Sequence, residues 1–352
     1  MKNHISTIGN LTLKYFVFAF SVGFGVLFFG CKSKEEVIDP QSEYVNIPDK
    51  NFEKALIRTG VDDIQDGKIL RKNALDIDEL DVSNNSTTDS SSKISSLEGV
   101  EAFINLWRLN VRYNLVKKID VSKNVNLIRL ICSSNQLTDI DVSNNIRLSL
   151  LNVSENNLTS INLEKNVALE YLYCWNNQLN ILDVSKNVRL TDLLCSNNRF
   201  TYLDFSNNYD LEQLSCDRNN LVSLNLSRNP LITKIFCNDN QLISLVFHDY
   251  VRVREIYCWN NKLKNIDTAN NPYLTKLSCS RNLLETLNIA KSIALKELFC
   301  NDNFLTSLDV SKNINLEKLW CPDNNIQTIC VNFNQITRDW YKDPTATYKV
   351  CP

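Results

Sequence analysis

A pattern of apolar positions recurs every 21 residues along most of the chain. The first row of 21 begins at Leu106 and the eleventh at Leu316, and the last row runs to about residue 336. Each row follows LxxLxCxxNxLxxLDVSxNxx, with an aliphatic residue at its first, fourth and fourteenth positions and Asn at its ninth. Because no insertion or deletion interrupts the rows, we expect eleven equal coils stacked on one another.

The spacing within a row predicts short strands. Apolar residues alternate at the fourth and sixth positions, which marks a strand with one buried face, and equivalent strands of successive coils should pair in parallel. A weaker copy of the same pattern is nested in each row, as in residues 305–313, so short strands are expected on both sides of the coil. The row is too short for a helix on its back, which would need about 8–12 residues.

Two columns of the row are predicted to fill its interior. The ninth-position Asn, from Asn114 to Asn324, should satisfy backbone groups where the chain turns inward and bond to the coils on either side. The sixth position is Val111, Val153 or a cysteine, and parallel Cβ vectors and a linear arrangement argue against disulfides or a metal site there. Nine buried thiols are therefore expected, at Cys132, Cys174, Cys195, Cys216, Cys237, Cys258, Cys279, Cys300 and Cys321.

The remaining cysteines suggest different roles. Cys330 and Cys351 lie outside the buried column, and we predict a disulfide between them that seals the last coil. At the other end, Lys2 and Lys14 precede an apolar run over residues 15–29 that suits a secretory signal of residues 1–30. The small residue before Cys31 resembles a bacterial lipoprotein cleavage box, which implies a lipid anchor on Cys31 and a flexible tether over 31–46. An ordinary signal peptide with an incidental cysteine is the alternative.

The rows resemble leucine-rich repeats of the short bacterial variety. IPDKNFEKALIRTG at 47–60 resembles the helical cap of bacterial repeat lipoproteins, with Phe52, Ala55 and Leu56 on one face and Gly60 as its stop. ISSLEGVEAFINL, which ends at Leu106, is similar to the entry segment of internalin-like proteins. The resemblance implies a β-rich leucine-rich repeat solenoid, with an N-terminal cap over 47–105, repeats over 106–329 and a C-terminal cap over 330–352.

The composition of the chain limits the classes of function that are expected. The chain has 352 residues, 38 of them basic and 40 acidic, a balance that argues against nucleic-acid binding. Its two histidines, of which His4 falls in the signal segment, leave little room for Ser-His or Cys-His catalysis, and no nucleophile–base pair or phosphate loop is evident. We therefore expect no enzyme and no cofactor.

Three weaker candidates are interpreted mainly as structural. Residues Asp62–Asn73 resemble a calcium-binding EF-hand loop but lack two of its ligands, so a turn into the first strand is favoured over calcium. His248 and Asp249 interrupt the pattern and are interpreted as a solvated loop. A column of carboxylates on the back of the coil should be relieved by nearby Ser and Lys: Asp120, Asp141, Asp183, Asp204, Asp267 and Asp309.

The first strand carries the candidate binding surface. Its fifth and seventh positions should face solvent, and they hold aromatic side chains that packing within a monomer does not require. These are Tyr173, Trp175, Phe236, Tyr257, Trp259, Phe299 and Trp320. We expect a cell-surface protein, anchored in the outer membrane and facing outward or toward the periplasm, that binds or adheres to a protein partner. Glycan capture for nutrient uptake and a purely structural role are the alternatives, because cross-strand stacking of these rings could simply stabilise the sheet.

Overall fold

The computed structural model describes residues 43–248, 252–268 and 271–351, which fall in one compact unit. The predicted signal segment and Cys31 lie outside the described residues. Residues 44–46, which were expected to belong to a flexible tether over 31–46, instead form strand β1 (Tyr44–Asn46), which pairs antiparallel with β2, Lys68–Leu70. No helix within these described ranges is long and apolar enough to span a membrane.

The N-terminal cap contains the helix that the sequence predicts. Helix α1 spans Lys50–Arg58, and the Asp49 carboxylate accepts hydrogen bonds from the backbone N–H groups of Asn51 (2.9 Å) and Phe52 (3.0 Å). The helix buries Phe52, Ala55 and Leu56, and Gly60 follows it with a φ of 78°. The short helix α2, Arg71–Leu75, and the 3₁₀ turns η1, Ser90–Ser92, and η2, Val100–Ala102, complete the cap.

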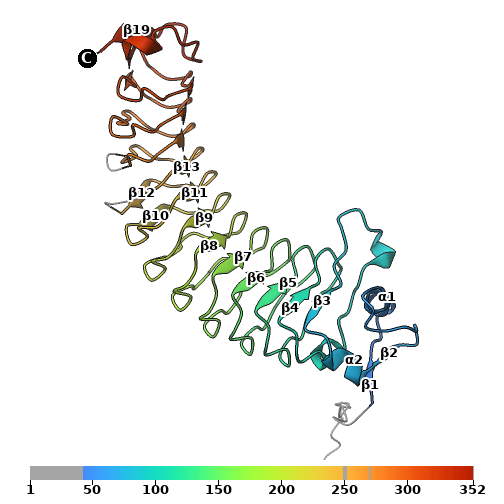
Figure 1. Ribbon diagram of the computed structural model, residues 1–352. Helices are drawn as coiled ribbons and strands as arrows, with labels where there is room; N and C mark the ends of the chain where they lie inside the picture. Colours follow the sequence, from blue (N-terminus) through green and yellow to red (C-terminus); the bar gives the residue numbers. More distant parts are fainter. Residues whose placement is uncertain (1–42, 249–251, 269–270, 352) are drawn as a thin grey trace, which may run out of the picture. The chain divides into compact units, whose positions relative to one another are not determined.

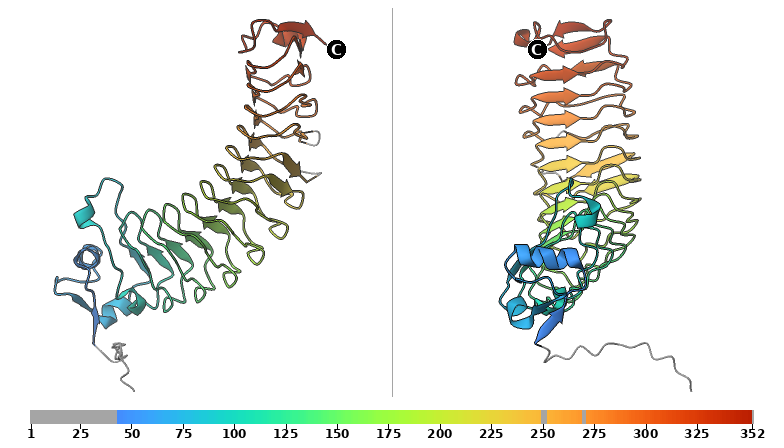
Figure 2. Two further views of the ribbon diagram at one scale, coloured as in Figure 1. Left: turned by 180° about the vertical axis from the view of Figure 1, so that it is seen from behind. Right: turned by 90° about the vertical axis from the view of Figure 1, so that its right-hand side faces the viewer.

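Parallel strands of successive coils form one twelve-stranded sheet, on the inner side of the arc that the coils follow (Figures 1 and 2). Its register advances by one row per strand, so Leu130 faces Leu151. The first strand, with buried Leu80, precedes the first predicted row and adds one member to the eleven expected. In order, the strands are β3 (Glu79–Asp81), β4 (Arg108–Asn110), β5 (Arg129–Ile131), β6 (Leu150–Asn152), β7 (Tyr171–Tyr173), β8 (Asp192–Leu194), β9 (Gln213–Ser215), β11 (Lys234–Phe236), β13 (Glu255–Tyr257), β14 (Lys276–Ser278), β15 (Glu297–Phe299) and β17 (Lys318–Trp320).

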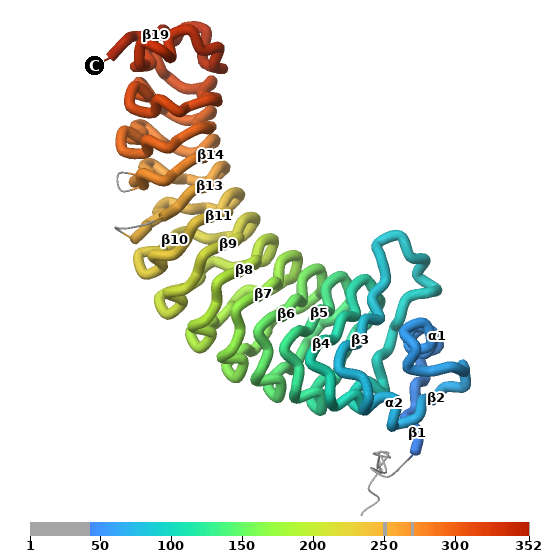
Figure 3. Tube along the Cα trace, in the orientation of Figure 1, coloured from blue at the N-terminus to red at the C-terminus, as the bar shows by residue number. Residues whose placement is uncertain are grey.

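Strands on the back are fewer than the sequence predicts. Among the described residues, only four coils carry one: β10 (Ser223–Leu226), β12 (Ser244–Phe247), β16 (Ser307–Asp309) and β18 (Thr328–Val331). The tube trace shows the coils fanning apart on the outer side of the arc (Figure 3). Parallel pairing needs strands about 4.8 Å apart, which the inner side of a curved stack maintains more easily than the outer side. Curvature therefore limits the second sheet that the nested motif predicts.

The ninth-position amides join each coil to the one before it. In the coil of Asn198, the side-chain N–H group donates to Cys174 O (2.9 Å) of the preceding coil and to Cys195 O (3.1 Å) of its own. Its carbonyl accepts from the backbone N–H of Leu179 (3.0 Å), also in the preceding coil. The prediction that each amide would reach both neighbours was wrong: the following coil is connected through its own Asn.

A second column of buried amides, at the nineteenth position, was not singled out from the sequence. Asn145 donates to Val121 O (3.0 Å) and to Asn124 O (2.9 Å), both in the preceding coil. The same two bonds recur in six further coils, at Asn124, Asn166, Asn187, Asn208, Asn229 and Asn313, although the first of these bonds to Phe103 O and the last to Ser292 O in place of an Asn carbonyl. Two polar columns therefore hold the stack together, one after the strand and one at the end of the back segment.

The C-terminal cap covers the last coil. Strand β19, Thr347–Val350, pairs in parallel with β18, and a disulfide joins Cys330 to Cys351 as predicted. A 3₁₀ turn, η3 (Phe333–Gln335), begins the cap, and the Trp340 indole N–H donates to Glu317 O (3.3 Å). Backbone hydrogen bonds also place Tyr341 along β17, which covers the exposed edge of the main sheet.

Candidate ligand-binding surface on the concave sheet

The inner face of the sheet presents the third, fifth and seventh positions of every row. The residues at the fourth and sixth positions are buried in the core. Side chains alternate along a strand, so those at the third, fifth and seventh positions point away from the core, into the solvent on the concave side of the sheet. A left-handed residue follows at the eighth position of all eleven rows, from Tyr113 to Asp323, with φ between 51° and 60°. This repeated backbone turn fixes where the seventh-position side chains sit relative to the strands.

The aromatic candidates all lie on this face, but they form two groups rather than one stripe. Tyr173 on β7 and the nearby Trp175 are separated from the others by two coils that carry Leu194 and Ser215 at the fifth position. The second group lies on or directly after the strands of the C-terminal coils: Phe236, Tyr257, Trp259, Phe299 and Trp320. Only Trp320 is classed as exposed, at 45%, and the other six rings are half-buried.

Part of the aromatic surface has structural partners, contrary to the expectation that packing would not account for it. Phe236 and Tyr257 stack across adjacent strands at 4.5 Å between ring centroids and 12° between planes. Trp320 packs against Tyr341 of the cap, with ring centroids 4.2 Å apart. Cross-strand aromatic pairs of this kind stabilise a sheet. These contacts assign Phe236 and Tyr257 largely to the scaffold.

Charges of alternating sign run beside the C-terminal aromatic group. The third positions of five successive coils are Lys234, Glu255, Lys276, Glu297 and Lys318. Lys234 contacts Glu255 at 3.0 Å, and Glu297 contacts Lys276 at 2.9 Å and Lys318 at 2.7 Å. Hydrogen bonds from Lys318 and Lys276 lower the pKa of Glu297 below its ordinary value. The charges of this row of Lys and Glu therefore neutralise one another, and the surface does not present a ligand with charge of a single sign.

Small side chains open a groove within the second aromatic group. The coil of β14 carries Ser278 and Ser280 at its fifth and seventh positions, between coils that carry large rings. The resulting shallow groove has a volume of about 440 Å³ and is lined by Trp259, Phe299 and Trp320 together with Ser278, Ser280, Arg281 and Asn301. This volume lies within the range of about 300–1,000 Å³ found for ligand sites. The combination of flat apolar walls and polar groups suits an anchoring side chain or a sugar ring.

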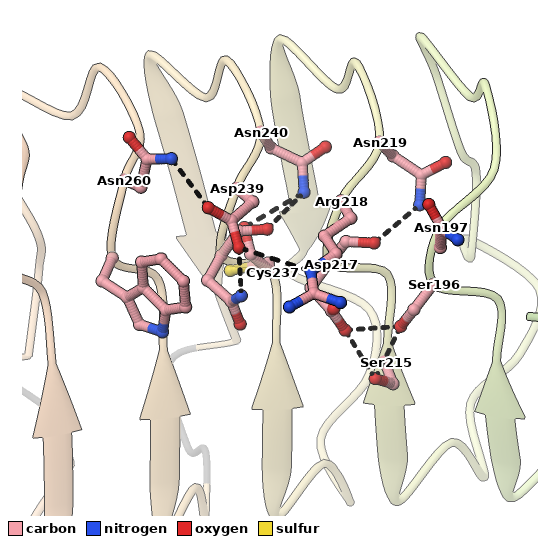
Figure 4. A network of polar contacts seen from close by, with 12 residues as sticks. Ser196, Asn197, Ser215, Asp217, Arg218, Asn219, Cys237, Asp239, Asn240 and Asn260 are labelled. Carbon is pink, nitrogen blue, oxygen red and sulfur yellow. Dashed lines mark hydrogen bonds and ion pairs between the residues drawn. The ribbon is translucent and has the colours of Figure 1, made fainter. Parts of the chain in front are cut away.

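A second, more polar hollow lies beside Trp175. Figure 4 shows the network along its rim, in which the Asp217 carboxylate accepts hydrogen bonds from the hydroxyl groups of Ser196 and Ser215. In the next coil, Asp239 accepts from the Asn260 amide (2.7 Å) and lies 3.8 Å from the Arg218 guanidinium. Because these polar groups already bond to one another, a ligand here would have to compete with an existing network.

The other candidates are accounted for by local structure. Buried Glu53 accepts hydrogen bonds from the backbone N–H groups of Asp66 (2.7 Å) and Gly67, so residues 62–67 form a turn into β2, and the rest of the Asp62–Asn73 segment is β2 and the start of α2. No cluster of three His, Cys, Asp or Glu residues suitable for a metal occurs in the described parts of the chain. His248 follows β12, and Asp249 lies outside the described residues.

Hydrogen bonds within their own turns reduce the repulsion between the carboxylates that stack on the back of the coils. Asp183 accepts from the backbone N–H of Ser185 at 2.9 Å, and this bond lowers the pKa of Asp183. The same two-residue turn recurs at Asp120, Asp141, Asp204 and Asp309. Only Asp309 of these lies on a regular strand. The Ser of the LDVS motif therefore supplies the backbone donor that stacked carboxylates require.

The buried thiols are as the sequence predicts. All nine are buried and unpaired, at no more than 1% exposure. Burial raises the pKa of Cys132, Cys174 and Cys279 to about 12, so these groups remain neutral thiols. They are apolar filling rather than reactive or metal-binding groups.

Comparison with known proteins identifies the fold. No protein-family model matches the sequence, and no curated protein matches it either. Among solved structures, the functional domain of InlJ from Listeria monocytogenes, described as including a cysteine ladder, is similar over 88% of this chain and 73% of its own, with 27% identity and a TM-score of 0.75. The fold is that of a bacterial leucine-rich repeat protein.

Two further structures support the same fold. The internalin InlF of Listeria monocytogenes matches 85% of this chain and 92% of its own, with 20% identity and a TM-score of 0.71. A leucine-rich repeat protein of Leptospira interrogans matches 74% of this chain and 69% of its own, with 20% identity and a TM-score of 0.63. Both structures share the leucine-rich repeat fold of the described unit.

Proposed function

We propose that this leucine-rich repeat solenoid binds a protein partner through its concave sheet, with the groove at Trp259, Phe299 and Trp320 as the anchor point. Curved repeat solenoids use their extended concave surfaces for binding. The observation that carries the proposal is the groove itself: three rings surround a coil whose small Ser278 and Ser280 leave room for a ligand group. A buried aromatic anchor at the centre of an interface commonly supplies most of the binding energy.

The expected location follows from residues outside the described unit. We propose that the chain is exported and held on the outer membrane by a lipid on Cys31. The support is the signal-like run over 15–29 and the small residue before Cys31. Metabolic labelling with an alkyne-bearing fatty acid should tag the wild-type chain and leave Cys31→Ser unlabelled. Equal labelling of both chains would exclude Cys31 as the acylated residue.

The binding site is tested with a pair of matched variants. The double variant Trp259→Ala/Phe299→Ala removes two groove walls and leaves both the Phe236–Tyr257 stack and the Trp320–Tyr341 contact intact. Tyr202→Ala, which removes a 66% exposed ring outside the groove, is the control. Affinity capture from the native environment should recover a partner with the wild type and the control, but not with the groove variant, while the melting temperatures of all three stay similar. Recovery of the same partner by the groove variant would remove the groove from the binding site.

Glycan capture is the second candidate function. Trp259 and Trp320 offer flat faces beside the Ser280 hydroxyl and the Asn301 amide, a combination that also suits sugar rings. A glycan array probed with the soluble unit distinguishes the two, because a protein receptor should be silent on every sugar. A purely structural surface protein would bind neither sugars nor proteins in these assays.

A further inference from the structure

A column of exposed apolar side chains, aliphatic except for one tyrosine, runs along one edge of the solenoid. It occupies the twentieth position of the row, in the turn directly before the strand segment. It shares no residue with the binding surface described above. Its members are between 44% and 61% exposed. We name this the edge column and define it as Ile104, Val125, Ile146, Val167, Val188, Tyr209, Ile293 and Ile314.

The edge column is systematic rather than accidental. Isolated exposed apolar residues are normal on protein surfaces, but contiguous apolar patches generally mark interaction sites. Here six successive coils, from Ile104 to Tyr209, each present an apolar side chain at the same place. Pro230 and exposed Pro272 keep the position non-polar in two of the coils between Tyr209 and Ile293. A turn position that is open to solvent does not itself require β-branched residues.

We propose that the edge column is a self-association surface, through which two copies of the chain pair antiparallel about a two-fold axis. The coils follow a smooth arc (Figure 3), and a two-fold axis that bisects such an arc within its plane superposes the edge on itself in reverse order. Every coil of one copy can then meet a coil of the other. A different partner would have to supply an apolar edge of matching length and curvature.

The area available is sufficient for a dimer. Eight side chains that are each about half-exposed amount to roughly 700 Å² per copy, close to the about 800 Å² per partner of a standard interface. The stems of the flanking long side chains would add to this area.

The flanking charges also favour a second copy over an anionic membrane. Basic side chains lie two positions before the edge column, at Lys123, Lys165, Lys186, Arg228, Lys291 and Lys312. Three positions further back lies the column of carboxylates that includes Asp120, Asp183 and Asp309. A surface with both signs is compatible with an equivalent surface, whereas the carboxylates would be repelled by anionic lipid.

Sedimentation of the folded unit, residues 42–352, tests the proposal. The wild type should show a concentration-dependent monomer–dimer equilibrium, and Ile146→Glu/Val188→Glu should raise the dissociation constant about tenfold or more without lowering the melting temperature. Ile181→Glu changes a 72% exposed aliphatic residue outside the edge column and should dimerise like the wild type. A wild type that stays monomeric at its highest soluble concentration would overturn the proposal, and so would equal weakening by the control.

The symmetry gives an independent readout. Tyr209 lies midway between Ile104 and Ile314 along the edge column, so it should sit near the two-fold axis when the whole column is engaged. Under mild oxidation Tyr209→Cys should form a covalent dimer, whereas Ile314→Cys, whose counterpart is near Ile104 of the second copy, should not. The reverse pattern would refute antiparallel pairing. Binding of the wild type, but not of the Glu double variant, to phosphatidylglycerol vesicles without dimerisation would indicate a lipid surface instead.

Discussion

Replacement of Asn198 by Ala tests whether the ninth-position amides hold the coils together. Asn198 lies in a central coil, is 8% exposed, and bonds to backbone groups of its own coil and the preceding one. The truncation removes these bonds from a site that water reaches poorly. We expect a large loss of stability from a substitution that removes little apolar surface.

The magnitude follows from which groups lose their partners. The backbone N–H of Leu179 donates to Asn198 and would be left buried and unpaired, at a cost of about 1–3 kcal/mol. The two carbonyl groups are better protected, because Cys174 O also accepts from Asn177 (3.1 Å) and Cys195 O from Asn219 (3.2 Å). Loss of one of two donors at each carbonyl should cost about 0.5–1.5 kcal/mol. The total is about 2–6 kcal/mol.

Urea unfolding followed by circular dichroism measures this loss. Asn180→Ala, an exposed Asn in the preceding coil, is the matched control and should change stability by less than about 0.5 kcal/mol. Asn198→Asp separates hydrogen bonding from shape, because a carboxylate can accept from Leu179 but faces two carbonyl oxygens with no donor. It should destabilise at least as much as Ala. If Asn198→Ala behaved like the Asn180 control, the amide column would not be what connects the coils.

Three further predictions concern the thiols, the cap and the charge ladder. Because burial raises the pKa of Cys132, Cys174 and Cys279 to about 12, a chain lacking Cys31 should not react with Ellman's reagent at pH 8 until urea unfolds it, and rapid labelling of the native protein would contradict their burial. Cys351→Ser should lower stability by about 3 kcal/mol, because the disulfide closes a 21-residue loop, and an unchanged urea midpoint would show that β19 holds the cap alone. Glu297 has a pKa lowered by Lys318 and Lys276, so its stabilisation is present above the ordinary value of about 4.3 and is lost as the pH falls through its folded pKa. Glu297→Gln should therefore reduce the difference in melting temperature between pH 7 and pH 3, whereas exposed Glu285→Gln should leave that difference as in the wild type.

The repeat could be predicted from sequence because its period is strict. Each buried position recurs at one place in the row, so Leu130 and Leu151 face each other without any need to infer register. The disulfide between Cys330 and Cys351 was also accessible, since both fall outside the buried column. Strand β3 was missed as a member of the sheet, although Ile77, Leu80 and Val82 show the same spacing, because the segment up to the first row is longer than 21 residues.

The surface was harder to predict than the interior. The stack of Phe236 on Tyr257 and the contact of Tyr341 with Trp320 depend on side-chain directions that a row pattern does not specify. The groove depends on small Ser278 between larger neighbours, a contrast that appears only when residues 42 positions apart are compared. The scarcity of back strands follows from curvature, which emerges from all coils together.

Site-specific photo-crosslinking tests the central claim, that the concave sheet is the surface that meets a partner, most directly. A photoreactive residue in place of Ser278, within the groove, is compared in cells with one in place of Asn180, which lies outside it. A discrete adduct from position 278 and none from position 180 is the predicted result. Adducts from position 180 with none from position 278 would place the interaction away from the groove.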